Sequence, residues 1–324
     1  MKGSSPARLL VGLAAVSITV ATAGPLHSQE RRSEALAERM AAMTAVTGYE
    51  QAVVDSLLRL LPAARRDRAG NAVITLGTGE PRRLFTCPLD EPGYVVGGIR
   101  DDGWLTLRRV GPAPSPLFDQ QLEGQRVTVF GIVGPVPGVV AVRSTHLARG
   151  RSASDEPFSI DQAYLDLGAS SPAEVEKLGV AVLSPVTLAK RPHRYGQELL
   201  AAPAAARRGA CAALATASLG TPAGIAPGQL VIAFTVESRI TRRGILTLGN
   251  TLGPFASTVI VDGGDEDLGQ LSEAVDTTLP PGRFGRVSLW SLPRRYGGSP
   301  VETIALQDVA NLERRLAQAF VGGR

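Results

Sequence analysis

The chain has 324 residues, of which 44% are hydrophobic and 20% are charged, a composition typical of a globular protein with more than one domain. Its formal net charge is +4, with 34 basic and 30 acidic residues interspersed along the sequence. Because the basic residues form no block, the composition does not favour a nucleic-acid-binding protein.

Residues 1–29 have the pattern of a secretory signal peptide. Lys2 and Arg8 form a basic start, and an apolar stretch follows at 9–23. Small residues at 21–23 offer a cleavage site, and a second candidate lies near Ser28. An uncleaved anchor is the alternative, but the apolar run is short for a membrane-spanning helix. We therefore expect a secreted or periplasmic protein that has no membrane attachment after signal cleavage.

Two amphipathic helices and a strand are predicted next. Residues 32–46 place Leu36, Met40 and Met43 at helical spacing. A second helix is predicted to stop at Pro62. Its apolar stripe consists of Val53, Val54, Leu57, Leu58 and Leu61. A turn at 67–71 then leads into a strand at 72–76.

The most informative stretch is 84–94, which reads L-F-T-C-P-L-D-E-P-G-Y. A short apolar run leads to two adjacent carboxylates, Asp90 and Glu91, and Pro92-Gly93 then predicts a loop. We expect a buried strand that presents these acids at its carboxyl end, where open α/β sheets place their chemistry.

The pattern changes at Gly93 and changes back near Val186. Short β-prone runs separated by glycine and proline predict a small antiparallel barrel. Beyond it, strands alternate with helices, which predicts a mixed or parallel sheet covered on both sides. The expected strands are 230–236, 258–261 and 287–292, and the expected helices are 204–217 and a C-terminal one bearing Val309, Leu312, Leu316 and Phe320 on one face.

Cys87 and Cys211 are the only cysteines, too few for a disulfide framework. Two buried free thiols are the interpretation that we favour, and a single bond between them in an oxidising compartment is the alternative. Cys87 with Asp90 and His193 could also form a thiol nucleophile, although nothing in the sequence fixes their geometry.

Several motifs resemble those of the glutamyl or tetrahedral aminopeptidases, a family of dinuclear zinc metallopeptidases also labelled cellulase M-like. They are T-G-Y-E at 47–50, D-R-A-G-N at 67–71 and the stretch 84–94, which resembles H-M-D-E-I-G-F. The resemblance covers about residues 35–320. It implies a mixed α/β sheet flanked by helices, formed by 30–92 and 187–324. It also implies an inserted β-barrel domain at 93–186, which in the family helps dimerisation and shapes the substrate chamber.

The resemblance also implies a metal site, which this sequence alters. The family holds two metal ions with two His, a bridging Asp, a Glu and a second Asp, and a further Glu is the general base. Matched motif by motif, the two His positions are Pro88 and Gly298, and the bridging Asp position is Ala205. Ser238 stands at the general-base position and Arg239 at a metal-binding Glu. Asp262 alone is retained, as the second Asp.

Little else in the sequence compensates for these changes. Outside the leader the only histidines are His146 and His193. Glu237, next to the general-base position, is expected to point to the opposite face of its strand. We therefore expect no catalytic residue, no bound metal and no other cofactor.

The sequence thus predicts an aminopeptidase-like protein that has lost most metal ligands and the general base, an inactive homologue that binds peptides or serves assembly. An active metal-dependent aminopeptidase or hydrolase with an altered site, using zinc or cobalt, is the alternative. The expected partners are a peptide or protein ligand and further copies of the chain, in a dimer or a larger homo-oligomer.

A last expectation concerns the space left by the metals. We expect the guanidinium of Arg239 to occupy it and to pair with Asp262 or with Asp90, because an unpaired buried carboxylate is costly. Arg207 is expected to be a lesser contributor. The alternative is that Arg239 points to solvent.

Overall fold

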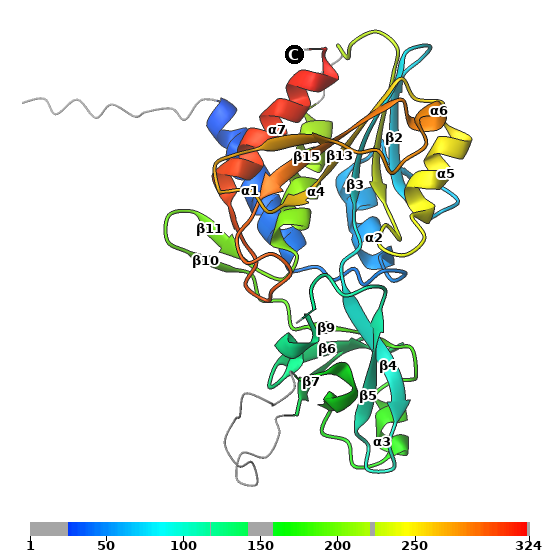
Figure 1. Ribbon diagram of the computed structural model, residues 1–324, viewed down its shortest axis with the longest axis vertical. Coiled ribbons are helices and arrows are strands. Elements are labelled where there is room, and N and C mark those ends of the chain that lie inside the picture. The colour runs from blue at the N-terminus through cyan, green and yellow to red at the C-terminus, as the bar shows by residue number, and fades with distance from the viewer. Residues whose placement is uncertain (1–24, 117, 142–157, 221–223, 323–324) are drawn as a thin grey trace, which may run out of the picture.

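The computed structural model describes residues 25–116, 118–141, 158–220 and 224–322, which form a layered α/β part and a smaller barrel (Figure 1). The first 24 residues of the predicted signal peptide and His146 lie outside this range. Within it, no helix has both the length and the hydropathy needed to cross a membrane.

A seven-stranded mixed sheet forms the α/β part, in the order β1-β2-β12-β3-β13-β15-β14. Its centre is parallel and consists of β12 (Gln229–Thr235), β3 (Arg82–Pro88), β13 (Ser257–Gly264) and β15 (Arg286–Pro293). Its edges are antiparallel and consist of β1 (Arg65–Arg66), β2 (Ala72–Gly77) and β14 (Ser272–Val275). The carboxyl ends of the four parallel strands therefore meet at one edge, where such sheets bind ligands.

Helices cover both faces of this sheet. One face packs against α1 (Pro25–Ala41), α2 (Gln51–Leu60), α4 (Ala205–Leu219) and α7 (Leu306–Phe320). The other face packs against α5 (Arg243–Thr251) and α6 (Pro281–Phe284). Phe85 and Ile232 contact the first group of helices, and their neighbours Leu84 and Val231 contact the second. This is the alternation expected of strands buried on both faces.

Helix α4 lies close to the sheet and to α7. A Cβ at Gly209 would come within 2.7 Å of Leu292 Cδ2 and 2.8 Å of Ile304 Cδ1, so only glycine permits this approach. A separate three-stranded sheet of β10 (His193–Tyr195), β11 (Leu199–Ala201) and β16 (Thr303–Ala305) completes the α/β part.

The second part is a closed barrel of strand order β4-β5-β8-β7-β6-β9. The strands are β4 (Gly93–Ile99), β5 (Leu105–Val110), β6 (Arg126–Phe130), β7 (Pro135–Val140), β8 (Tyr164–Asp166) and β9 (Pro185–Leu188). The barrel has its own core, in which Val96, Leu165 and Val186 are fully buried. Two 3-10 helices, η1 (Phe118–Leu122) and η2 (Ile160–Gln162), and the short helix α3 (Pro172–Lys177) belong to the same part.

The predicted fold class, a mixed sheet flanked by helices with an inserted small barrel, is confirmed. The domain limits at 93 and 186 stay a prediction. One local prediction needs refinement: β3 ends at Pro88, before the two acids, and the connection that carries them spans only 89–92. Gly93 begins β4, and the segment before it pairs with 45–47 through Glu91 N to Ala45 O at 2.8 Å and Thr47 N to Glu91 O at 3.3 Å. The strand β3 therefore leads almost directly into the barrel.

Candidate functional site

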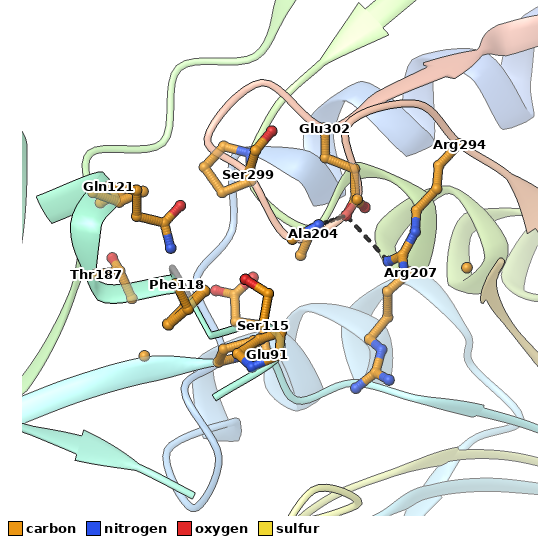
Figure 2. A pocket seen from close by; sticks show the side chains of 18 of the residues that line it. Glu91, Ser115, Phe118, Gln121, Thr187, Ala204, Arg207, Arg294, Ser299 and Glu302 are labelled. Atoms are coloured by element: carbon orange, nitrogen blue, oxygen red, sulfur yellow. Dashed lines mark hydrogen bonds and ion pairs between the residues drawn. The ribbon is translucent and has the colours of Figure 1, made fainter. Parts of the chain in front are cut away.

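A cleft of about 380 Å³ lies between the barrel and the carboxyl edge of the parallel strands (Figure 2). Its sheet side includes Arg207, Arg239, Asp262 and Arg294, and its barrel side includes Ser115, Phe118, Gln121 and Thr187. Of the positions predicted from the sequence, Arg239, Asp262 and Gly298 line the cleft. Pro88, Asp90 and Ala205 are buried and are not part of its lining.

Asp90 is fully buried just after β3, and its carboxylate is held on several sides. Oδ2 accepts hydrogen bonds from Thr47 Oγ1 and from the backbone N–H of Arg239, both at 2.9 Å. Oδ1 accepts a hydrogen bond from Ser238 Oγ. These contacts join the end of β3 to the loop after β12.

Arg207, in the first turn of α4, reaches two carboxylates from neighbouring strands. Its Nε and Nη2 donate to Asp262 Oδ1 and Oδ2 at 2.9 and 2.6 Å, a bidentate pair. Its Nη1 donates to the backbone oxygen of Asp90 and lies 3.6 Å from Asp90 Oδ1. Burial lowers the pKa of Arg207, but Asp262 and Asp90 outweigh it and the pKa is raised. A permanent cation therefore lies between the two carboxylates.

Arg239 does not take the position that the sequence suggested for it. Its side chain makes a 3.4 Å hydrogen bond from Nη2 to the backbone oxygen of Pro112, and no ion pair within 4 Å joins it to a described carboxylate. The reason is geometric. Arg207 projects from α4 toward both carboxylates, whereas Arg239 lies in the loop after β12 and reaches the backbone oxygen of Pro112 in the loop after β5.

The loop at 236–239 is held by the motifs near the start of the chain. Asn71 Oδ1 accepts from Val236 N at 3.0 Å, and Asn71 Nδ2 donates to Gly244 O at 2.9 Å. Glu50 Oε1 accepts from Glu237 N at 2.8 Å. Burial raises the pKa of Glu50, which the backbone hydrogen bonds offset only in part. The T-G-Y-E and D-R-A-G-N motifs therefore position the loop that carries Ser238 and Arg239.

The carboxylate of Glu237 points away from the cleft. It forms an ion pair with Arg243 at 2.5 Å and accepts from Thr241 Oγ1 at 3.2 Å. Glu237 is not among the residues that line the cleft. It cannot act as a general base there without a change of the backbone.

A second group of charged side chains, centred on Glu91, is buried beside Arg207 and its two carboxylates. Glu91 pairs with Lys190 and, at 3.1 Å, with Arg208, and it accepts from Ala45 N at 3.0 Å. Burial raises the pKa of Glu91, but the two cations outweigh it and the pKa is lowered. Burial lowers the pKa of Lys190 to about 8. The negative charge of Glu91 offsets the effect of burial only in part, and the positive charge of Arg208 lowers the pKa further.

Glu302 connects the amino end of α4 to the loop that carries Gly298. Oε1 accepts from Ala206 N at 2.9 Å, and Oε2 accepts from Gly298 N at 2.9 Å and from Arg294 Nη1 at 3.2 Å. A carboxylate is favoured at a helix N-terminus by the free N–H groups and the helix dipole. Gly298 has a φ of +72°, a conformation that side chains rarely adopt, so a histidine at this position would be strained.

The two cysteines form a disulfide, so the favoured prediction of two free thiols is wrong. Cys87 at the end of β3 is bonded to Cys211 in α4, with 5.4 Å between their Cα atoms. Helix α4 packs over β3, which brings together residues 124 positions apart. The bond also excludes Cys87 as a nucleophile, and His193 is exposed on β10 and stacks on Tyr195.

Four residues of the site had no role in the sequence-based prediction: Lys190, Arg208, Arg294 and Glu302. Arg208 and Glu302 lie three and four residues from Ala205 and Gly298, the nearest positions that the family resemblance singled out. In the sequence, each of these four residues is a charged residue in an otherwise apolar or turn segment. Exposed charged residues show the same pattern, so the sequence does not distinguish these four.

Comparisons with known proteins agree with this architecture. The family model for M42 glutamyl aminopeptidase matches residues 70–276. The putative aminopeptidase SgcX of Escherichia coli is 32% identical over 221 residues, which cover 65% of this chain and 57% of SgcX. The lysyl aminopeptidase of Pyrococcus furiosus is 28% identical, over 42% of this chain and 40% of that enzyme. The matches thus span about half the length of these curated relatives.

Solved structures show the same fold over a longer range. The PhTET1-12s structure, a dodecamer, has a TM-score of 0.78 and 22% identity, covering 89% of this chain and 99% of its own. The aminopeptidase APDkam598 of Desulfurococcus kamchatkensis has a TM-score of 0.77 and 19% identity, covering 90% and 95%. Because the family model matches well over half of the sequence, the chain belongs to the M42 glutamyl aminopeptidase family.

Proposed function

We propose that this chain is a non-hydrolytic member of the family that keeps the cleft as a peptide-binding site. The observation that carries the proposal is the position of Arg207, whose guanidinium bridges Asp262 and Asp90 at the carboxyl edge of the sheet. A guanidinium can neutralise carboxylates, but it is neither a Lewis acid nor a source of activated water. The function that fits this geometry is binding without hydrolysis.

The donors at this edge do not fit a pair of divalent cations. Both oxygens of Asp90 accept hydrogen bonds from protein groups, and both oxygens of Asp262 are paired with Arg207. Within the described ranges, no group of three or more His, Cys, Asp or Glu side chains is placed to hold a metal ion. Catalytic zinc needs at least three protein ligands, and a second ion needs more.

The positions implied by the family resemblance point the same way. Pro88, Ala205, Arg239 and Gly298 offer no metal-binding atom in their side chains, and the Ser238 hydroxyl donates to Asp90. A serine hydroxyl that already donates to a carboxylate is no substitute for a carboxylate general base. We derive no hydrolytic step for this chain.

We also propose that the chain assembles into a homo-oligomer. The support is that a structural neighbour, PhTET1, is described as a dodecamer and as a tetrahedron or octahedral shell. Sedimentation velocity at micromolar concentration tests the proposal. A particle of about 34 kDa, the mass of one chain, would contradict it.

Export from the cytoplasm is the third part of the proposal. It is supported by the pattern of residues 1–29 and by the buried disulfide, since structural disulfides persist mainly in oxidising compartments. Fractionation of cells that express the chain tests it, with recovery of the mature protein in the periplasm or medium as the expected result.

The decisive experiment combines metal analysis with an activity assay. The protein is purified without chelators, its zinc and cobalt are measured, and it is tested on aminoacyl reporter substrates with Zn²⁺ or Co²⁺ added. We expect substoichiometric metal and no turnover above a heat-denatured control. Two metal ions per chain together with turnover would establish the alternative, an active aminopeptidase with an altered site.

A further inference from the structure

The charges around the cleft are paired with one exception. The anions that line it are Glu91, Asp262, Asp265 and Glu302, and each has an ion-pair partner within 4 Å. The cations that line it are Lys190, Arg207, Arg239 and Arg294. Of these, Arg239 alone has no ion-pair partner among the described residues.

Arg239 is held at the cleft with most of its hydrogen-bonding capacity unused. Of its five N–H donors, the side chain uses one, in the 3.4 Å contact with Pro112 O. Its Nε is buried and has no partner in the described part of the chain. Burial and the charge of Arg207 lower the pKa of Arg239, and the more distant charges of Asp90 and Asp262 offset this only in part.

A peptide amino group would find no equivalent partner. An ammonium needs a carboxylate, but Asp262 is in the bidentate pair with Arg207, and Glu302 is occupied by Arg294 and two backbone N–H groups. Glu91 is shared by Lys190 and Arg208. Asp265, the most exposed of the four anions, is already paired with Arg294 at 2.7 Å. An ammonium would have to compete with these cations, whereas a carboxylate would meet a guanidinium that has no ion-pair partner among the described residues.

We propose that the cleft binds peptides through a carboxylate that the guanidinium of Arg239 receives. This inference rests on the proposed peptide-binding function, and it places the charge contact at a carboxylate rather than at the amino group on which an aminopeptidase acts. The carboxylate is that of the peptide C-terminus or of an acidic side chain, and both would form the same charge-assisted, bidentate contact.

The surroundings of Arg239 can hold the remainder of such a peptide. Its Nη2 contacts the loop after β5, and Pro114 and Ser115 of that loop line the cleft. Figure 2 shows Phe118, Gln121 and Thr187 on the barrel side, opposite Arg207 and Arg294. These residues offer hydroxyl and amide groups for a peptide backbone and an aromatic ring for a side chain.

Isothermal titration calorimetry of the full chain with capped tripeptides tests the inference. The first probe is N-acetyl trialanine with a free C-terminus, and the second is trialanine amide, which has only a free amino group. The third is N-acetyl trialanine amide with its central residue replaced by glutamate, which carries only a side-chain carboxylate. We expect a peptide with a carboxylate to bind about 10-fold to 100-fold more tightly than trialanine amide. The stronger of the two carboxylate probes identifies the source.

The variants assign this preference to one side chain. Arg239→Gln should remove it, Arg239→Lys should restore part of it, and Arg295→Gln should leave it intact because exposed Arg295 lies outside the cleft lining. Equal or tighter binding of trialanine amide, no binding of either carboxylate probe, or an unchanged preference in Arg239→Gln would overturn the inference. The metal and turnover assays judge the absence of hydrolysis separately, so the two proposals can fail independently.

Discussion

Two regions meet at the carboxyl edge of the sheet and differ in how their side chains are used. The frame consists of Thr47, Glu50 and Asn71, which hold the loop after β12 and the carboxylate of Asp90. The centre consists of Arg207 and its two carboxylates, Asp90 and Asp262. Glu50 and Asn71 form hydrogen bonds with backbone groups of the loop. In the centre, by contrast, a guanidinium neutralises two carboxylates.

The difference separates the contacts that hold the backbone from those that balance charge. A buried backbone N–H needs its acceptor whether or not a metal is present, so the frame serves the fold itself. The carboxylates of the centre need only a cation, and a guanidinium satisfies that need. Frame and centre can therefore be separated by mutation.

Reducing or removing the disulfide should have the largest effect, because it ties β3 to α4 and so supports both regions. For a closed loop of this length, chain entropy predicts a loss of about 5 kcal/mol in the free energy of unfolding. The double variant Cys87→Ala, Cys211→Ala measured by urea denaturation checks this. A loss below about 1 kcal/mol would show that the two elements are held mainly by packing.

The centre should respond strongly to loss of its cation. Arg207→Ala leaves Asp90 buried without its guanidinium, and we expect a loss of about 3 kcal/mol because removing one partner of a buried pair strands the other charge. Adding Asp262→Asn should recover part of the loss. Arg243→Ala, which breaks a more exposed pair with Glu237, is the matched control with an expected loss of at most about 1 kcal/mol. Equal losses in Arg207→Ala and the control would contradict the role assigned to the centre.

The frame should lose stability when an uncharged side chain, that of Asn71, is removed. Asn71→Ala removes the acceptor of Val236 N and the donor to Gly244 O, both buried contacts, with an expected loss of about 2 kcal/mol. Amide hydrogen exchange at 236–239 should accelerate in this variant more than in Arg207→Ala. The reverse order would mean that the centre, not the frame, holds the loop.

Lys190 gives a pH test at the flank of the centre. Its folded-state pKa is lowered from the ordinary lysine value of 10.5 to about 8, so above about pH 8 the folded chain binds fewer protons than the unfolded chain. Stability from this group therefore rises with pH, by about 1–2 kcal/mol between roughly pH 7.5 and 9.5. The rise should be present in the wild-type chain and absent in Lys190→Met. A parallel pH profile in both proteins would contradict it.

The sequence predicts the layers of this molecule better than its contacts. The apolar runs at 84–85 and 230–236 are local, so the buried strands follow from them, and the identities at 88, 205, 238 and 298 can be matched to family motifs directly. Three features could not be predicted. The Cys87–Cys211 bond, the Lys190–Glu91 pair and the choice of Arg207 over Arg239 each depend on where α4 and the barrel return to the sheet. Such contacts join residues far apart in the chain, for which periodicity carries no information.

The smallest effect on stability should come from Arg239→Ala. If Arg239 occupied the metal space, its loss would cost as much as that of Arg207, about 3 kcal/mol. Its side chain instead makes one long hydrogen bond and lies near the like charge of Arg207. Removing it relieves that repulsion, but it also loses a longer-range attraction to Asp90 and Asp262 and some packing of the aliphatic stem, so we expect a change within about 1 kcal/mol. Urea denaturation of Arg239→Ala beside Arg207→Ala, at low and high salt, measures the difference. A loss for Arg239→Ala that equals that for Arg207→Ala would place both arginines in the centre and would leave the cleft without a free cation.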